Sequence, residues 1–166
     1  MSKTYNAVKI SENVYWVGAV DWGIRDFHGY LTKRGSTYNA YLVLGDKTTL
    51  VDTVKAPFKD ELLSRVASVV DPASISDLIS NHAEPDHTGA MAGVLDAIRP
   101  EKIFASKMGV KALKDHYHQD WEIQAVSDGE SLNLGSHEVT FYETKMLHWP
   151  DSMLSYLSDV EVLFSQ

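Results

Sequence analysis

Hydrophobic positions in the first part of the chain follow a strand pattern and then a helix pattern. Alternating apolar residues predict strands over residues 14–17, 38–44 and 48–53. The last two flank Gly45-Asp46-Lys47, a turn sequence typical of a β-hairpin. A polar loop, residues 21–30, precedes this hairpin. Apolar residues then recur at helical spacing from Phe58 to Val70, and Asp71-Pro72 ends the predicted helix.

Strands and helices alternate from residue 75 onward. Apolar runs predict strands over 75–79, 102–106 and 121–126, and helices over 89–98 and 107–117. This alternation is the signature of β-α-β units, so the sequence predicts an α/β fold. Further strands are predicted over 131–134, 138–143 and 160–165, with a loop at 147–152.

The composition is acidic: 15 basic and 23 acidic residues give a formal net charge of −8, and the pI is about 5.2. Such a surface repels phosphate backbones and anionic lipids, and no apolar run is long enough to span a bilayer. We therefore expect neither nucleic acid nor a membrane as a partner. With 44% hydrophobic residues, the composition is that of a folded domain rather than a disordered chain. The first residues lack the pattern of a secretory signal, which favours a cytoplasmic location.

Residues with coordinating side chains concentrate between His82 and His87. His82, Glu84, Asp86 and His87 can each bind a metal ion, and they lie between a predicted strand and a predicted helix, where α/β folds usually bind ligands. His82 and Glu84 can point the same way in an extended stretch, whereas Asp86 and His87 can aim at a second point. This spacing favours two metals over one. A solvated loop in which Asp86 caps the helix is the alternative, but four donors together favour metal binding.

The types of donor narrow the choice of metal. The chain has no cysteine, which excludes disulfides, a thiolate nucleophile and cysteine-ligated zinc or iron–sulfur sites. Imidazoles mixed with carboxylates suit iron, manganese or zinc, and a second carboxylate makes the site harder and more anionic. We therefore expect iron or manganese.

The pattern H-x-E-x-D-H at 82–87 resembles the H-x-H-x-D-H motif of the metallo-β-lactamase superfamily. Glu84 takes the place of the second histidine, a replacement typical of the flavodiiron proteins, also called A-type flavoproteins. Three other stretches resemble the same family: DWGIRDFHGY at 21–30, STYNAYL at 36–42 and MLHWPDSMLSYL at 146–157. The resemblance covers essentially the whole chain. It implies a metallo-β-lactamase-like αββα sandwich, of which these residues would be the N-terminal portion.

Carried over residue by residue, the resemblance implies two non-haem iron ions. His82, Glu84 and His148 resemble the ligands of the iron nearer the flavin. Asp86 and His87 resemble ligands of the other iron. These five residues form the candidate metal site.

Two other residues lie in stretches that resemble the family. His28 resembles a pocket residue near the irons rather than a ligand, with a simple hydrogen bond inside its loop as the alternative. Trp149 is a candidate wall of the pocket, with an ordinary core aromatic as the alternative. The remaining histidines are expected outside the site: His116, His118 and His137.

The resemblance implies reduction of O₂ to water, or of NO to N₂O, at the diiron centre. Electrons would come through FMN. In the family's head-to-tail homodimer, or in a homotetramer, the FMN of one chain would lie beside the irons of another. A rubredoxin-like protein is the expected electron donor. Two alternatives belong to other classes: a zinc hydrolase of esters or thioesters with the same superfold, against which Glu84 argues, and a non-catalytic domain that keeps only the fold.

The C-terminal residues depart from the family pattern. The family has LFSND-type sequence here, whose Asp bridges the two metals, whereas this chain has LFSQ with Gln166 in place of Asn. A further histidine ligand and a flavodoxin-like FMN domain would follow downstream. We therefore expect residues 1–166 to be a metallo-β-lactamase-like diiron domain that is truncated on its C-terminal side and inactive alone.

Overall fold

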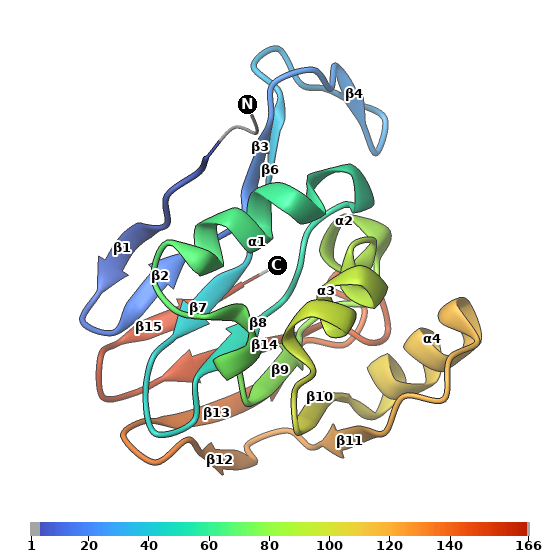
Figure 1. Cartoon of the computed structure of the whole chain (residues 1–166). Helices are drawn as coiled ribbons and strands as arrows, with labels where there is room; N and C mark the ends of the chain where they lie inside the picture. The colour runs from blue at the N-terminus through green and yellow to red at the C-terminus, as the bar shows by residue number, and fades with distance from the viewer. Residues whose placement is uncertain (1–3, 166) are drawn as a thin grey trace.

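Two β-sheets lie face to face in the computed structural model, which describes residues 4–165 (Figure 1). The larger sheet has the strand order β1-β2-β7-β8-β9-β10-β11, and the smaller has the order β12-β13-β14-β15. The strands of the larger sheet are β1 (Val8–Ser11), β2 (Val14–Trp16), β7 (Tyr41–Val43), β8 (Thr49–Val51), β9 (Asp77–Ser80), β10 (Lys102–Ser106) and β11 (Ile123–Val126). Those of the smaller sheet are β12 (Ser131–Asn133), β13 (Glu138–Glu143), β14 (Met153–Leu157) and β15 (Val162–Phe164).

Helices pack on the face of the larger sheet that points away from the smaller one (Figure 1). They are α1 (Lys59–Ala67), α2 (Pro85–Thr88), α3 (Met91–Ile98) and α4 (Lys107–Tyr117), with 3₁₀ turns at Ala56–Phe58 and Pro72–Ser74. The part of the chain that the structure describes therefore has three layers, α-β-β. Among residues 4–165 no helix has the length and apolar character that crossing a membrane requires.

An arm made of residues 19–38 extends from the end of the sheets (Figure 1). Its strands pair as β3 (Ala19–Asp21) with β6 (Ser36–Tyr38), and as β4 (Asp26–Phe27) with β5 (Tyr30–Leu31). At the base, the buried Tyr38 hydroxyl donates to Asp21 Oδ2 at 2.9 Å. The tip turns at His28 and Gly29, both with positive φ, so the fold of the arm determines where His28 lies.

The central strands of the larger sheet, β8 and β9, are buried at every residue, so both of their faces are covered. Successive residues point to opposite faces: Leu50 and Leu78 pack against the helices, whereas Val51 and Ile79 pack against the smaller sheet. These four side chains are at most 1% exposed. Two apolar cores, one on each face, therefore hold the central strands in place.

The parallel strands β8, β9 and β10 end at the same edge of the larger sheet. Asp52 follows β8, Asn81 follows β9 and Ser106 ends β10. The Asp52 N–H donates to the carbonyl of Ile79 at 2.8 Å, which joins the first two of these strand ends. Ligands in α/β folds are usually bound at such an edge, and the candidate site lies there.

The predicted α/β fold is confirmed, and several boundaries agree to the residue. β10, α4 and β13 span the predicted 102–106, 107–117 and 138–143. Elements that were not predicted include the short strands β4 and β5, which lie within or at the end of the predicted polar loop at 21–30, as well as β14 and α2. β14 alternates buried and half-buried residues directly after the predicted loop at 147–152, and α2 is a single turn between the predicted strand 75–79 and the predicted helix 89–98.

Candidate metal centre

The segment 81–88, between β9 and the end of α2, carries four of the predicted ligands. Glu84 has extended backbone (φ −66°, ψ 145°) and precedes Pro85, the first residue of α2. Proline is favoured at this first helical position because its missing N–H has no partner in a helix anyway. Asp86 and His87 lie within the single turn of α2, two and three residues after Glu84. His82 lies two residues before Glu84, so the segment presents all four side chains over a short distance.

Gly89 keeps this segment close to the turn before α1. A Cβ at Gly89 would lie 2.4 Å from the carbonyl oxygen of Pro85 and 2.8 Å from the amide nitrogen of Ala56. Both contacts are with backbone, which cannot move aside as a flexible side chain can. The absence of a side chain at this position is therefore a condition for the observed path of the chain.

Three donor atoms meet at one point above the segment. His82 Nε2 lies 3.1 Å from Glu84 Oε2, and His148 Nε2, from the loop between β13 and β14, lies 2.9 Å from the same oxygen. The two Nε2 atoms are 3.3 Å apart. Donors about 2.1 Å from one ion and about 90–110° apart lie about 3.0–3.4 Å from one another, so the three atoms fit a single metal ion.

Asp151 determines which nitrogen of His82 faces this point. Its Oδ2 lies 3.0 Å from His82 Nδ1 and accepts from the Ala83 N–H at 2.7 Å. With the proton on Nδ1, the lone pair of Nε2 points at Glu84 and His148, the arrangement found around metal-bound histidines. Burial alone would raise the pKa of Asp151, but the hydrogen bonds from His82 and Ala83 outweigh it and lower the pKa. Sequence reasoning missed Asp151, which lies in the MLHWPDSMLSYL stretch.

The pKa of His82, the partner of Asp151, is also shifted. Burial alone would lower the pKa of His82, but its hydrogen bond to Asp151, the charge of Asp151 and the hydrogen bond to Glu84 together raise it. The side chains of His82 and Asp151 are 1% and 3% exposed. The pair is therefore buried and fixed.

A second possible donor group lies on the other side of Glu84. His28, Glu84 and Asp86 bring their ligand atoms within 4.8 Å of one another. His28 Nε2 lies 3.4 Å from Glu84 Oε1, and its ring contacts that of Phe27 at a tilt of 51°, with 4.0 Å between centroids. The imidazole therefore points at the candidate centre and not only at its own loop.

Asp86 and His87 face one another beside this second group. Asp86 Oδ2 lies 3.3 Å from His87 Nε2, and among the described residues neither Asp86 Oδ1 nor His87 Nδ1 has a hydrogen-bond partner. Burial would raise the pKa of Asp86, but the hydrogen bond from His87 lowers it. Burial would lower the pKa of His87, but Asp86 and the charge of Asp52 raise it. Buried polar atoms without partners indicate room for a further ligand.

Asp52 lies beneath the segment at the end of β8. Its Oδ1 accepts from the Asn81 N–H at 2.7 Å, and its backbone has a positive φ of 58°. Complete burial raises the pKa of this carboxyl from 3.8 to about 6. Asp52 was not predicted from the sequence, because nothing local distinguishes it from the other acidic residues.

Replacing Asp52 with asparagine should change how stability depends on pH. In the wild type, folding raises the pKa of Asp52 from 3.8 to about 6, so the free energy of unfolding falls as the pH rises through this window. Asparagine keeps an acceptor for Asn81 and tolerates positive φ, but it does not titrate. The free energy of unfolding of the variant should therefore rise relative to wild type between about pH 4 and pH 7. Urea denaturation with chelator present measures this, and a difference independent of pH would contradict it.

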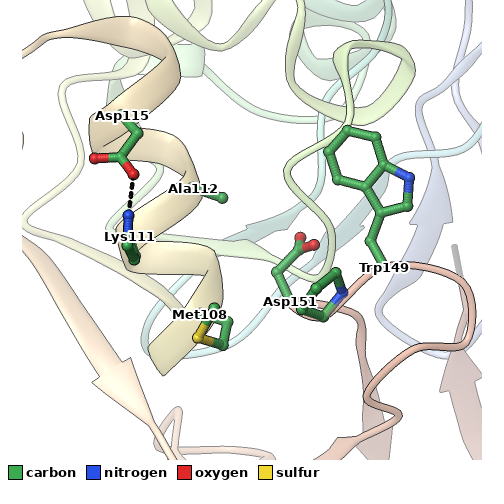
Figure 2. Close-up of a pocket in the computed structure, with 7 residues that line it drawn as sticks. Met108, Lys111, Ala112, Asp115, Trp149 and Asp151 are labelled. Carbon is green, nitrogen blue, oxygen red and sulfur yellow. Dashed lines mark hydrogen bonds and ion pairs between the residues drawn. The ribbon is translucent and has the colours of Figure 1, made fainter.

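A pocket of about 250 Å³ opens between α4 and the loop that follows His148 (Figure 2). Its walls are Met108, Lys111, Ala112, Asp115, Trp149, Pro150 and Asp151. The Trp149 ring lies nearly perpendicular to that of His82, with 5.3 Å between centroids. Trp149 is 40% exposed, so it lies at the rim of the candidate centre and not in a core.

The other histidines lie away from both donor groups. His116 and His118 are exposed at the end of α4. His137 is buried at the start of β13, where its Nδ1 lies 2.5 Å from Asp159 Oδ2. The structure thus brings His82, Glu84 and His148 together, and it places Asp86, His87 and His28 beside them.

Known proteins share this fold and much of this sequence. A family model described as ODP family beta lactamase matches residues 37–166. The rubredoxin-oxygen oxidoreductase of Megalodesulfovibrio gigas is 55% identical over 96% of this chain and 40% of its own length. The nitric oxide reductase of Moorella thermoacetica is 45% identical over 94% of this chain and 40% of its own length. The crystal structure of the flavodiiron protein from Giardia intestinalis has a TM-score of 0.92 at 34% identity, and the match covers 99% of this chain and 41% of that one.

The fold and the site define an α/β domain of the β-lactamase type with a group of histidines and carboxylates able to hold a metal ion. The chain belongs to the ODP beta-lactamase family, and its relatives confirm the predicted resemblance to flavodiiron proteins. It spans 40% of the length of the two curated relatives described above.

Proposed function

We propose that this chain holds a non-haem diiron centre that reduces O₂ to water, or NO to N₂O, with electrons delivered through FMN. The observation that carries the proposal is the position of Glu84, whose two carboxylate oxygens lie between three imidazoles. A carboxylate at this point gives a hard, anionic donor set that suits iron better than zinc. The relatives named rubredoxin-oxygen oxidoreductase and nitric oxide reductase support the same function and do not favour a zinc hydrolase.

The proposed ligands divide between two irons. His82, Glu84 and His148 would hold the iron nearer the flavin, and their three donor atoms have the separations that one ion requires. Asp86 and His87 would hold the other, and their free buried atoms support this assignment.

The residues of this chain contribute mainly by position. When bound, the two irons would supply electrons and adjacent binding positions for O₂ or NO. Asp151 fixes the tautomer of His82, and His28 lies within reach of Glu84. His82 and Glu84 are buried from bulk water, whereas the side chain of His148 is 57% exposed and leaves one side open to a partner.

Exposed apolar side chains lie on the two segments that carry His148 and His28. Met146 and Leu147 precede His148, and Trp22 and Tyr30 lie on the arm that carries His28. Exposed apolar patches of this kind mark contacts with other proteins. They support a head-to-tail homodimer, or a homotetramer, in which a flavodoxin-like domain of a partner subunit brings FMN. A rubredoxin-like protein would supply the electrons, and the cytoplasm is the proposed location.

Metal content and gas consumption test the proposal together. The protein, reconstituted anaerobically with Fe²⁺ and Zn²⁺ in equal amounts, should take up two irons per chain. Joined to a flavodoxin-like FMN domain and given a reduced rubredoxin-like donor, it should then consume O₂ or NO at an electrode. Zinc uptake with ester or thioester hydrolysis would instead support the hydrolase, and iron uptake without gas consumption would contradict the reductase.

Replacing Glu84 with histidine should shift the metal preference from iron towards zinc and abolish gas reduction. The variant restores the H-x-H-x-D-H pattern and replaces a hard anionic donor by a neutral imidazole. The iron-to-zinc ratio, measured by elemental analysis after reconstitution with both metals, should fall by about tenfold or more. A Glu138→His variant, on an exposed position of β13, is the control and should keep the wild-type ratio. Retention of iron and activity by the Glu84 variant would refute the role given to this carboxylate.

A further inference from the structure

The last residue of α4 is hydrogen-bonded to the segment that carries the proposed ligands. The Tyr117 hydroxyl donates to the Thr88 carbonyl oxygen at 2.6 Å and lies 2.9 Å from Thr88 Oγ1. Thr88 is 1% exposed, and its own hydroxyl lies 2.9 Å from the carbonyl of Ala83 and 3.0 Å from that of Glu84. The two hydroxyls therefore join α4 to both ends of α2.

Helix α2 depends on such outside contacts. It has four residues, and no side chain caps its first turn at Glu84. A helix this short gains little from its own hydrogen bonds, and its last carbonyls have no partner within it. The Thr88 carbonyl is one of these, and Tyr117 supplies the missing donor. The position of Asp86 and His87 therefore rests on contacts outside α2.

The other end of α4 holds the second ligand-bearing loop. Ser106 caps the helix by accepting from the Gly109 N–H at 3.0 Å, and its hydroxyl donates to the carbonyl oxygen of Asp151 at 2.7 Å. The Asp151 carboxylate in turn holds His82. One helix thus contacts both the segment 81–88, at its C-terminal end, and the loop that carries His148, at its N-terminal end.

We propose that α4 positions the two ligand-bearing loops relative to one another and that Tyr117 is a positioning residue for the metal centre, acting through Thr88. This inference rests on the metal centre proposed above. Tyr117 touches no candidate ligand atom itself. Its hydroxyl holds the turn that carries Asp86 and His87.

Replacement of Tyr117 by phenylalanine tests the proposal. The change removes the hydroxyl and keeps the ring, which packs against Trp121 with 5.2 Å between centroids. Titration of the protein with Co²⁺ against a competing chelator, well below the unfolding temperature, should show about tenfold weaker binding. Amide hydrogen exchange of residues 84–89 in the metal-free protein should be about fivefold faster, because one hydrogen bond is lost. Tyr142→Phe, on the exposed side of β13, is the matched control and should change neither quantity.

The outcomes of these measurements distinguish a positioning role of Tyr117 from a purely structural one. Weaker Co²⁺ binding together with faster exchange at 84–89 would support the positioning role. A lower unfolding temperature with unchanged Co²⁺ affinity would overturn it, because the hydrogen bond would then stabilise the fold without arranging the ligands. Unchanged exchange at 84–89 would overturn it as well. Failure of the wild-type protein to bind Co²⁺ would overturn the metal centre itself, and the inference with it, without any variant being compared.

Discussion

Replacing His148 with alanine is expected to weaken metal binding by about 100-fold while leaving the metal-free protein almost as stable as the wild type. The side chain is 57% exposed, so its removal creates no cavity in a core. Its Nε2 nevertheless lies 2.9 Å from Glu84 and 3.3 Å from His82, so it supplies a third of the first donor group. Fe²⁺ titration against a chelator and urea denaturation of the metal-free protein measure the two quantities separately.

The second metal position provides an internal reference for this experiment. Asp86 and His87 contact one another and not His148, so metal held by these two should be weakened far less. His118→Asn is the matched control, because His118 is exposed and has a left-handed backbone that asparagine tolerates. Equal metal loss in the control, or unchanged iron content in the His148 variant, would remove His148 from the site.

The residues of the candidate site that could be predicted from the sequence alone are those that lie close together in one short segment. His82, Glu84, Asp86 and His87 lie within one segment, and the strand before it and the helix after it fix where that segment lies. Asp151 could not be found in this way. Its partner His82 is 69 residues away in the sequence, and the packing of the two sheets against one another brings the two side chains to 3.0 Å. The available signal was that Asp151 lies three residues after the candidate ligand His148. That position does not reveal that its carboxylate is hydrogen-bonded to His82.

Secondary structure was likewise predictable where local sequence determines it and not where contacts distant in the sequence do. The boundary between β10 and α4 was predicted to the residue because Ser106 both ends an apolar run and caps the helix that follows. Helix α2 was missed because no local preference makes four residues helical. It forms because Pro85 starts it and Tyr117 completes its last turn from 29 residues away. Tertiary contacts of this kind leave no periodic pattern in a sequence.

Replacing Asp151 with alanine should destabilise the metal-free protein by about 3–5 kcal/mol and weaken metal binding by about 10–100-fold. The carboxylate is 3% exposed and accepts from His82 Nδ1 at 3.0 Å and from the Ala83 N–H at 2.7 Å. Alanine leaves both donors buried without a partner, which is costly in a low-dielectric interior. Urea denaturation with chelator present measures the loss of stability. Asp115→Ala is the matched control, because Asp115 lines the same pocket but is exposed and pairs with Lys111 (Figure 2).

An asparagine at position 151 keeps the acceptor and removes the charge. His82 Nδ1 and the Ala83 N–H contact the same oxygen, Oδ2, so an amide oxygen in that place can accept from both donors. Most of the stability lost in the alanine variant should therefore return, and the His82 proton should stay on Nδ1, with the lone pair of Nε2 on the side of Glu84. Metal binding of Asp151→Asn should return with the stability, because the tautomer that binds a metal is preserved. If stability returned while metal binding stayed as weak as in the alanine variant, the carboxylate charge, and not the tautomer that it fixes, would be what Asp151 contributes to metal binding.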